Sequence, residues 1–161
     1  METIFHSENI SFVKVNDNLV NDYLKMVNDF EGVAQYIGKR RTPYTVEEEL
    51  NFVKAKLEAK APIFSMIESK SGEFIGNIEF MDIKDGFGEL GIAITAKKQD
   101  MDYGTEAIQR MLAYGFAELG LKRVVLKVYP NNARAIHVYE KCGFVTYDAT
   151  DEDIYMEVVA D

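Results

Sequence analysis

A mixed α/β fold is predicted by three features of the 161-residue chain. Segments with the alternation or β-branching typical of strands are interleaved with segments whose apolar residues recur at helical spacing. Three strand segments in the middle of the chain are separated by turn residues, which favours antiparallel hairpins. Further on, a strand, a helix and a strand (88–95, 104–119 and 123–129) predict a right-handed parallel unit. We therefore expect a mostly antiparallel sheet of about seven strands with a central parallel β-α-β unit and helices on both faces.

The N-terminal part of the chain predicts a strand and two helices. Ile10–Val15 is alternating and β-branched, and Asp17–Val27 has apolar residues at helical spacing. Residues 29–44 contain two glycines, a basic triplet and a proline, so we expect them to be irregular. Thr45 and Glu48 have the capping-box spacing that marks the start of a helix. Four apolar residues of this second helix are expected to face the core: Val46, Leu50, Val53 and Leu57.

The rest of the chain alternates between strand and helix patterns. The three hairpin strands are expected at Pro62–Glu68, Phe74–Ile83 and Gly88–Thr95. Gly104–Leu119 has the strongest helical pattern, and Gly120 ends it. A buried strand, a short helix and two final strands complete the prediction, at Arg123–Tyr129, Asn132–Lys141, Phe144–Ala149 and Ile154–Val159.

Length and composition favour one domain, residues 1–161, with 47% apolar and 28% charged residues. No apolar run approaches the ~20 residues of a membrane span, and the first twelve residues do not resemble a secretion signal. We therefore expect a cytoplasmic protein without a membrane partner. The net charge of −9 argues against nucleic-acid binding and favours cationic partners. One cysteine and two distant histidines offer no metal-ligand cluster, so no metal is expected.

Three segments carry a more specific signal: Gly88–Thr95, Gln99–Gly104 and Asn132–Phe144 (NARAIHVYEKCGF). Together they resemble the GNAT superfamily of N-acetyltransferases, in particular the branch of ribosomal-protein N-terminal and spermidine acetyltransferases. The resemblance covers nearly the whole chain, and the last motif is the most specific. It implies an acyltransferase that uses acetyl-CoA as co-substrate, and it makes a homodimer plausible.

The family resemblance implies that residues 99–104 hold the coenzyme pyrophosphate. In the family, a Gln/Arg-x-x-Gly-x-Gly/Ala loop wraps the pyrophosphate with backbone N–H groups at a helix start. Gln99 and Gly104 agree with this pattern, whereas Asp102 replaces the middle glycine. Its Cβ and its poorer tolerance of positive φ hinder close approach. The carboxylates of Asp100 and Asp102 also repel phosphate by roughly 1 kcal/mol each, unless Lys97 and Lys98 offset them or both carboxylates turn to water.

The resemblance also implies contacts along the strand and the short helix. Backbone groups near Ile92–Ile94 pair with the pantetheine arm, and one N–H polarises the thioester carbonyl. Asn132 contacts the arm, and Tyr139 faces the departing sulfur. From the residues alone, the strand fits a buried strand, Asn132 an N-cap and Tyr139 a core aromatic equally well. The expected cofactor-binding residues are Ile92, Ala93, Ile94, Gln99, Met101, Asp102, Tyr103, Gly104, Thr105, Asn132 and Tyr139.

The expected catalytic residues are Tyr139, Glu79 and Glu89. Proton transfer from a tyrosine of pKa ~10 to a thiolate whose thiol has pKa ~8.5 is uphill by about 2 kcal/mol, so Tyr139 is expected to assist by hydrogen bonding. An acceptor ammonium of pKa ~10 must first lose a proton. Glu79, slightly favoured, and Glu89 are the candidate bases, although either can be a strand residue that faces solvent. The residues expected to contact the acceptor are Phe30, Tyr36, Tyr44 and Glu79.

Two functions remain open at this point. The first is direct acetyl transfer to a primary amine, either a peptide or protein N-terminus or a small amine such as a polyamine. No covalent enzyme intermediate is needed, because a thioester is already activated and no nucleophile triad is visible. The second is a non-catalytic binding or sensor module of the same fold, whose coenzyme binding is weakened by Asp102. On the second hypothesis, Asp102→Gly tightens coenzyme binding.

Overall fold

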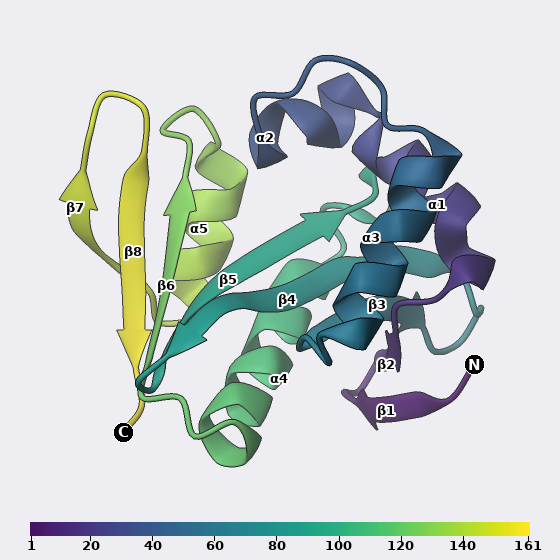
Figure 1. The fold of residues 1–161 in the computed structure, drawn as a ribbon. Coiled ribbons are helices and arrows are strands. Elements are labelled where there is room, and N and C mark those ends of the chain that lie inside the picture. Colours follow the sequence, from purple (N-terminus) through teal and green to yellow (C-terminus); the bar gives the residue numbers. More distant parts are fainter.

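The computed structural model describes residues 1–161 as one eight-stranded sheet flanked by helices (Figure 1). The strand order is β1-β2-β3-β4-β5-β6-β8-β7, and only the β5–β6 pair is parallel. The strands are β1 (Thr3–His6), β2 (Ile10–Lys14), β3 (Ile63–Glu68), β4 (Phe74–Lys84), β5 (Phe87–Ile94), β6 (Arg123–Val128), β7 (Val145–Ala149) and β8 (Ile154–Val159). The helices are α1 (Val20–Val27), α2 (Gln35–Ile37), α3 (Val46–Glu58), α4 (Tyr103–Glu118) and α5 (Ala133–Lys141). The predicted mixed sheet with a parallel β5-α4-β6 unit is confirmed.

Two elements were not predicted. Strand β1 adds an eighth strand to the expected seven; it is only four residues long and mostly exposed, so it has no apolar pattern. Residues 29–44 are not wholly irregular, because they contain a π-helical turn (Phe30–Ala34) followed by α2. None of the helices is both long and apolar enough to span a membrane.

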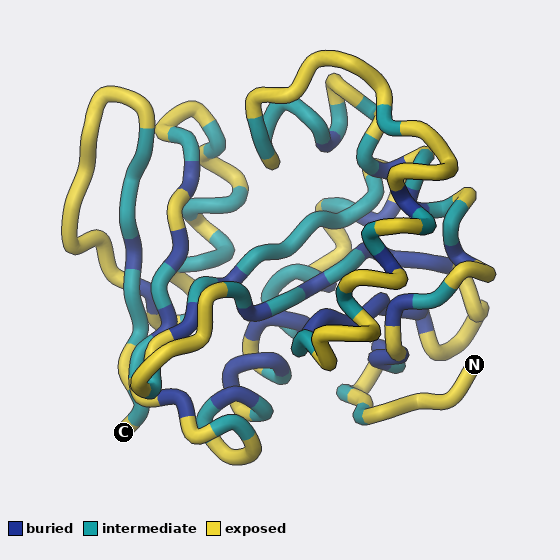
Figure 2. Tube along the Cα trace, in the orientation of Figure 1, coloured by how far each residue is buried: buried dark blue, intermediate teal, exposed yellow.

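The sheet separates two apolar cores (Figure 2). One core lies between the sheet and α4, with α5 packed beside it, and is built around Ile78, Phe80, Ile108 and Met111. The other lies under α1 and α3. Alternation along the strands supplies both, so that Phe12 of β2 faces the first core and Val13 faces the second.

The predicted buried face of α3 is partly wrong. Its capping box is present, with Thr45 N donating to Glu48 Oε1 (3.1 Å) and Glu48 N donating to Thr45 Oγ1 (3.2 Å). However, Val46 and Leu57 are exposed, although both were expected to face the core. Val53 is buried in the core as predicted. Lys56 also lies toward the sheet, where its ammonium forms an ion pair with Glu79 on β4.

Candidate functional site

The parallel strands β5 and β6 separate before they end. Residues 87–89 of β5 pair with residues 123–125 of β6, and no pairing follows, although β5 continues to Ile94 and β6 to Val128. The two strands therefore diverge and leave a gap in the sheet (Figure 1). A strand edge inside such a gap has unpaired backbone groups that can bind an extended ligand.

Alternate residues of β5 direct their backbone N–H and C=O groups into this gap. Thr95 N–H donates to Ile75 O of β4 (2.9 Å), so the odd-numbered residues at this end of β5 face β4. By alternation, Ile94 and Ile92 direct their N–H and C=O groups into the gap. The side chain of Gln99 already donates to Ile94 O (2.9 Å). The groups free for a ligand are therefore the N–H groups of Ile92 and Ile94 and the C=O group of Ile92.

Helix α4 begins beside the end of β5 with unsatisfied N–H groups. Asp102 precedes it in the left-handed conformation (φ +65°) and makes no side-chain cap. The N–H groups of Tyr103, Gly104 and Thr105 find no acceptor in the protein. Because these groups carry the positive end of the helix dipole, they form a site for an anion such as a phosphate.

Gly104 is not required by the packing of the protein itself. A Cβ at this position would lie 3.5 Å from Val138 Cγ1 and 3.6 Å from Ile94 Cδ1, both ordinary contact distances. Its φ is not in the left-handed region. The absence of a side chain therefore leaves the first turn of α4 open to close approach by a ligand, in accord with a coenzyme pyrophosphate at these N–H groups.

The acidic residues of the loop are exposed and lie near basic residues of α5. The Asp102 side chain is 91% exposed, with its carboxylate 3.9 Å from the Lys141 ammonium. Asp100 is paired with Arg134 of α5 (3.0 Å). Of the two alternatives left open by the sequence, exposure of the carboxylates to water fits the structure better than an offset by Lys98, because the Lys98 ammonium is paired with two other carboxylates, Glu68 and Glu73.

The side chains of the loop mostly support the protein. Gln99 Nε2 donates to Gly32 O as well as to Ile94 O (both 2.9 Å), which ties the π-helical turn to the end of β5. Its N–H is also used, by Ala96 O (3.2 Å). The Tyr103 hydroxyl turns inward, whereas Met101 is exposed. What this loop offers a coenzyme is therefore chiefly its backbone.

Helix α5 presents Asn132 and Tyr139. Asn132 Oδ1 caps the helix by accepting from Ala135 N (3.3 Å), which leaves its amide donors free, so a cap and a ligand contact can coexist. Tyr139 packs against Phe144, with ring centroids 6.0 Å apart, and burial raises its pKa to about 12. Its hydroxyl has no hydrogen-bond partner in the protein and is free to donate to a ligand. Burial also raises the pKa of the nearby Cys142 thiol to about 11, which makes it a poor nucleophile.

The two candidate bases lie on the same face of the sheet. Glu79 is opposite Gly91 on β5, and Glu89 lies two residues before that glycine, so the two glutamates are diagonal neighbours. Glu79 Oε1 accepts from the Lys56 ammonium (2.8 Å). Glu89 has no hydrogen-bond or ion-pair partner, so its carboxylate is the freer of the two.

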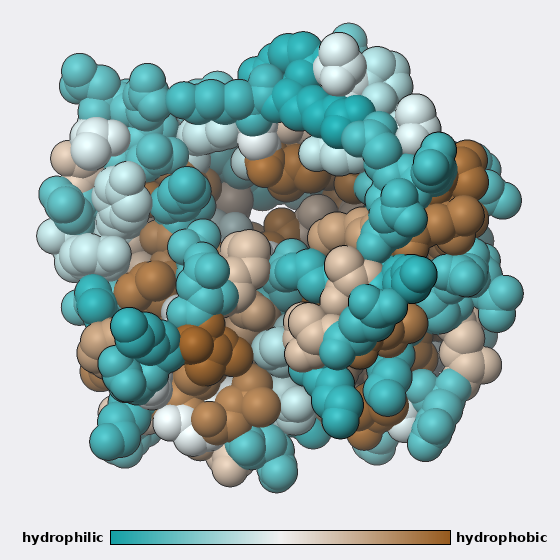
Figure 3. Space-filling model, in the orientation of Figure 1, coloured by the Kyte–Doolittle hydropathy of each residue, from teal (hydrophilic) through white to brown (hydrophobic).

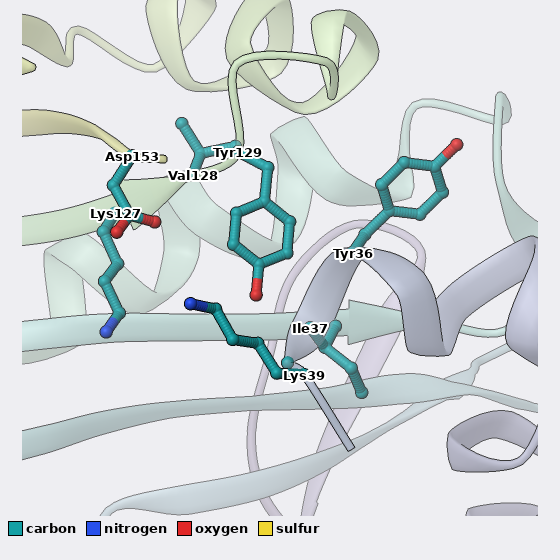
Figure 4. Close-up of a pocket in the computed structure, with 8 residues that line it drawn as sticks. Tyr36, Ile37, Lys39, Lys127, Val128, Tyr129 and Asp153 are labelled. Carbon is teal, nitrogen blue, oxygen red and sulfur yellow. The ribbon is translucent and has the colours of Figure 1, made fainter. Parts of the chain in front are cut away.

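A cavity of about 320 Å³ lies where α2 faces the end of β6 (Figure 4). Figure 3 shows an opening in the surface at this place, below the α2 segment. Of the residues expected to contact the acceptor, only Tyr36 lines this cavity. Phe30 and Tyr44 lie elsewhere, beside the guanidinium groups of Arg41 (5.1 Å) and Arg40 (3.9 Å).

The sequence analysis missed the other polar residues of the cavity, namely Lys39, Lys127, Tyr129 and Asp153. Lys127 and Tyr129 belong to a segment that was predicted as buried, where alternation nevertheless turns every second residue to the other face. Lys39 bridges to Glu152 of the β7–β8 turn (2.9 Å), so the loop after α2 and that turn meet at the cavity. No local pattern in the sequence predicts this long-range pair.

Comparison with known proteins gives consistent results. The family model described as "Acetyltransferase (GNAT) domain" matches residues 10–145. An uncharacterized N-acetyltransferase of Bacillus licheniformis is 32% identical over 90 residues, which cover 55% of this chain and 51% of that protein. The spermidine N(1)-acetyltransferase of Vibrio cholerae is 30% identical over 93 residues, which cover 56% and 54%. The chain thus spans about half the length of the curated relatives it matches.

Two solved structures share the whole fold. The crystal structure of an acetyltransferase (GNAT family) from Bacillus anthracis superposes with a TM-score of 0.84 at 23% identity and covers 96% of each chain. A spermidine N-acetyltransferase from Vibrio cholerae, in complex with CoA and spermine, gives a TM-score of 0.84 at 20% identity and covers 95% of this chain and 96% of that one.

Proposed function

The chain belongs to the GNAT acetyltransferases, and from this membership we propose that it is an N-acetyltransferase that moves an acetyl group from acetyl-CoA directly to a primary amine. The observation that carries the proposal is the gap between β5 and β6. Its open end is bordered by the unsatisfied N–H groups at the start of α4 and by the cavity beside Tyr36. A phosphate-bearing thioester and an amine can therefore approach one another through the sheet.

The backbone of β5 supplies the groups for holding the thioester. The free N–H and C=O groups of Ile92 are suited to pair with an extended pantetheine arm. The Ile94 N–H is suited to donate to the thioester carbonyl oxygen, where negative charge develops as the amine attacks. Asn132 adds side-chain amide donors from α5.

Tyr139 is proposed to donate a hydrogen bond to the departing sulfur. With its pKa raised to about 12 by burial, complete proton transfer to the thiolate of a thiol of pKa ~8.5 is uphill by about 5 kcal/mol. The hydroxyl therefore stays protonated while the C–S bond breaks, and it stabilises the thiolate as a donor. The proton that the amine loses is the natural one to neutralise the product thiolate.

The incoming amine is proposed to lose its proton to Glu89, directly or through water. Because Glu79 already accepts a hydrogen bond from Lys56, its carboxylate is less available, which reverses the preference for Glu79 drawn from the sequence. Glu79 is then proposed to lie beside the acceptor in a supporting role. Separate Glu→Gln variants at the two positions rank them by their loss of kcat.

The acceptor is proposed to be an amine with a single ammonium group. The cavity beside Tyr36 contains one unpaired carboxylate, Asp153, and one unpaired ammonium, Lys127, since Lys39 is taken by Glu152. A polyamine would find only one counter-charge there. The similarity to a spermidine acetyltransferase makes spermidine the essential comparison compound in an acceptor screen.

The proposal is tested with purified protein and the variant Gly104→Ala. Calorimetry is expected to show micromolar binding of acetyl-CoA, and a screen of amines and N-terminal peptides to release free thiol. Gly104→Ala adds a methyl group that the protein accommodates. It also favours the helix, by less than the ~1 kcal/mol of a helix interior because Gly104 is in the first turn of α4. The variant should therefore melt at a slightly higher temperature yet bind acetyl-CoA at least tenfold more weakly.

Gln109→Ala, an exposed change in the same helix, is the matched control and should leave acetyl-CoA affinity unchanged. Failure of the wild-type protein to bind acetyl-CoA would overturn the enzymatic proposal in favour of a non-catalytic module. The exposed carboxylate of Asp102 argues against that result.

A further inference from the structure

Both ends of the loop at residues 99–102 are attached to one carboxylate. Lys98 precedes the loop and Tyr103 follows it, and both side chains turn into the protein toward Glu68 at the end of β3. Lys98 Nζ lies 3.3 Å from Glu68 Oε2, and the Tyr103 hydroxyl donates to the same oxygen. Two residues five positions apart, one on each side of the loop, therefore bind the same carboxylate oxygen.

This group of side chains is buried and fully hydrogen-bonded. Glu68 is 3% exposed, and Lys98 and Tyr103 are each 7% exposed. Ser71, in the β3–β4 turn, donates to Glu68 Oε1 (2.6 Å), and Lys98 donates a second time, to Glu73 Oε1 (2.7 Å). A buried charge is tolerated only when it is paired and hydrogen-bonded in this way, and its geometry is correspondingly fixed.

The loop itself needs an external constraint. Asp100 and Asp102 are both left-handed (φ +60° and +65°), a conformation that costs an L-residue roughly 1 kcal/mol or more. Strained residues of this kind persist only where their surroundings determine the conformation. The side chains of Asp100 and Asp102 are largely exposed and supply little of that constraint. It comes instead from Gln99, which is tied to Gly32 O and Ile94 O, and from the buried anchors on either side of the loop.

We propose that Glu68, acting through Lys98 and Tyr103, is a positioning residue that holds the loop and the first N–H groups of α4 in the arrangement that receives the coenzyme pyrophosphate. The inference rests on the function proposed above and adds the source of its preorganisation. Fixing the backbone costs about 1–2 kcal/mol per residue. A loop that is already fixed does not pay this cost when the ligand binds.

The protonation states support a role that does not vary around neutral pH. Hydrogen bonds from Ser71, Tyr103 and Lys98 lower the pKa of Glu68 to about 2. Burial, together with the neighbouring Glu68, raises the pKa of Tyr103 to about 12. The carboxylate and the phenol therefore keep one charge state, and one set of hydrogen bonds, throughout the range in which an amine acceptor titrates.

The decisive variant is Tyr103→Phe, which removes one oxygen and leaves the ring packing and the Glu68–Lys98 pair in place. We expect about a tenfold rise in the acetyl-CoA Kd and KM, kcat and amine KM within twofold of wild type, and faster hydrogen exchange in residues 99–105. Glu68→Gln, which removes the charge from the centre of the network, should have the same effect or a larger one.

Glu106→Gln is the matched control. Glu106 is also a carboxylate in the first turns of α4, but it accepts from Ser7 and Asn9 of the β1–β2 turn. This variant should lower the melting temperature and leave the acetyl-CoA KM unchanged. If Tyr103→Phe lowers the melting temperature but leaves the acetyl-CoA KM and the exchange of residues 99–105 at wild-type values, Glu68 is only structural and the inference is wrong. Failure of the wild-type protein to bind acetyl-CoA would instead overturn the proposed function.

Discussion

At the scale of single residues, Tyr139 offers the clearest test of mechanism. Its hydroxyl is unpartnered in the protein and its pKa is raised to about 12. Tyr139→Phe should therefore lower kcat by 10- to 100-fold, in line with the loss of one transition-state hydrogen bond. Acetyl-CoA affinity should change by less than twofold, because the ring still packs on Phe144. Calorimetry and steady-state kinetics separate the two quantities, and an equal loss in both would identify Tyr139 as a packing residue.

Asp102 gives a second prediction, which differs from the expectation based on the sequence. Because its side chain is 91% exposed, Asp102→Gly should alter acetyl-CoA affinity by less than twofold. Relief of the left-handed conformation, worth about 1 kcal/mol, is largely cancelled by the ~0.5–1 kcal/mol of extra chain entropy that glycine loses on folding. The melting temperature should therefore stay nearly constant. Affinity that rises tenfold in low salt would show that the carboxylate repels the pyrophosphate after all.

At the scale of elements, helix α3 depends on its N-terminal cap. The Thr45 hydroxyl accepts from Glu48 N, and the Glu48 carboxylate accepts from Thr45 N and from Arg40. Thr45→Ala should lower the free energy of unfolding by about 1 kcal/mol, as measured by urea denaturation. Thr42→Ala, three residues earlier in the exposed loop, is the control and should have little effect. A loss of less than about 0.3 kcal/mol at Thr45 would mean that Arg40 holds the helix end without the cap.

Some of the helices and strands could be predicted from the sequence and others could not. The hairpin strands, α4 and the parallel unit were predicted because turn residues and strict periodicity are local signals. The face of α3 was not, because Lys56 is oriented by Glu79 on β4, a partner 23 residues away. The burial of Lys98 was not predicted for the same reason, because its two carboxylate partners lie on another hairpin. Long-range ion pairs therefore account for much of what local patterns missed.

In the candidate site, too, residues in local motifs were predicted and residues brought together from distant segments were not. Gly104, Asn132 and Tyr139 lie in motifs that identify a family, so the sequence could single them out. The cavity beside Tyr36 is assembled from α2, the end of β6 and the β7–β8 turn, three segments that are far apart in the chain. Phe30 and Tyr44 were grouped with Tyr36 because they share one loop, but the loop turns them toward Arg41 and Arg40 instead.

For the whole molecule, the loss of stability in acid follows from carboxylates whose pKa values are lowered in the folded state. Hydrogen bonds hold the pKa of Glu48 and of Glu68 at about 2, against a usual value of 4.5. Between these values the unfolded chain binds more protons than the folded one, so stability falls as the pH decreases from about 4.5 to 2. Urea midpoints should be flat from pH 7 to about pH 5 and then drop steeply. Glu68→Gln should lower the midpoint at pH 7 and reduce the drop, and an unreduced drop would contradict this assignment.

The short parallel pairing between β5 and β6 has a consequence for the stability of the whole molecule. Strand pairing joins the strands β1 to β5 to the group formed by β6, β8 and β7 at residues 87–89 and 123–125 alone, whereas the core beside α4 contains residues of both groups. Beyond the paired residues, the two groups of strands are therefore held together by side-chain packing rather than by backbone hydrogen bonds between β5 and β6. A molecule bound to Ile92 and Ile94 on one side and to α5 on the other would connect the two groups of strands across the gap. We therefore expect bound coenzyme to raise the melting temperature of the whole molecule, because it binds the folded state only.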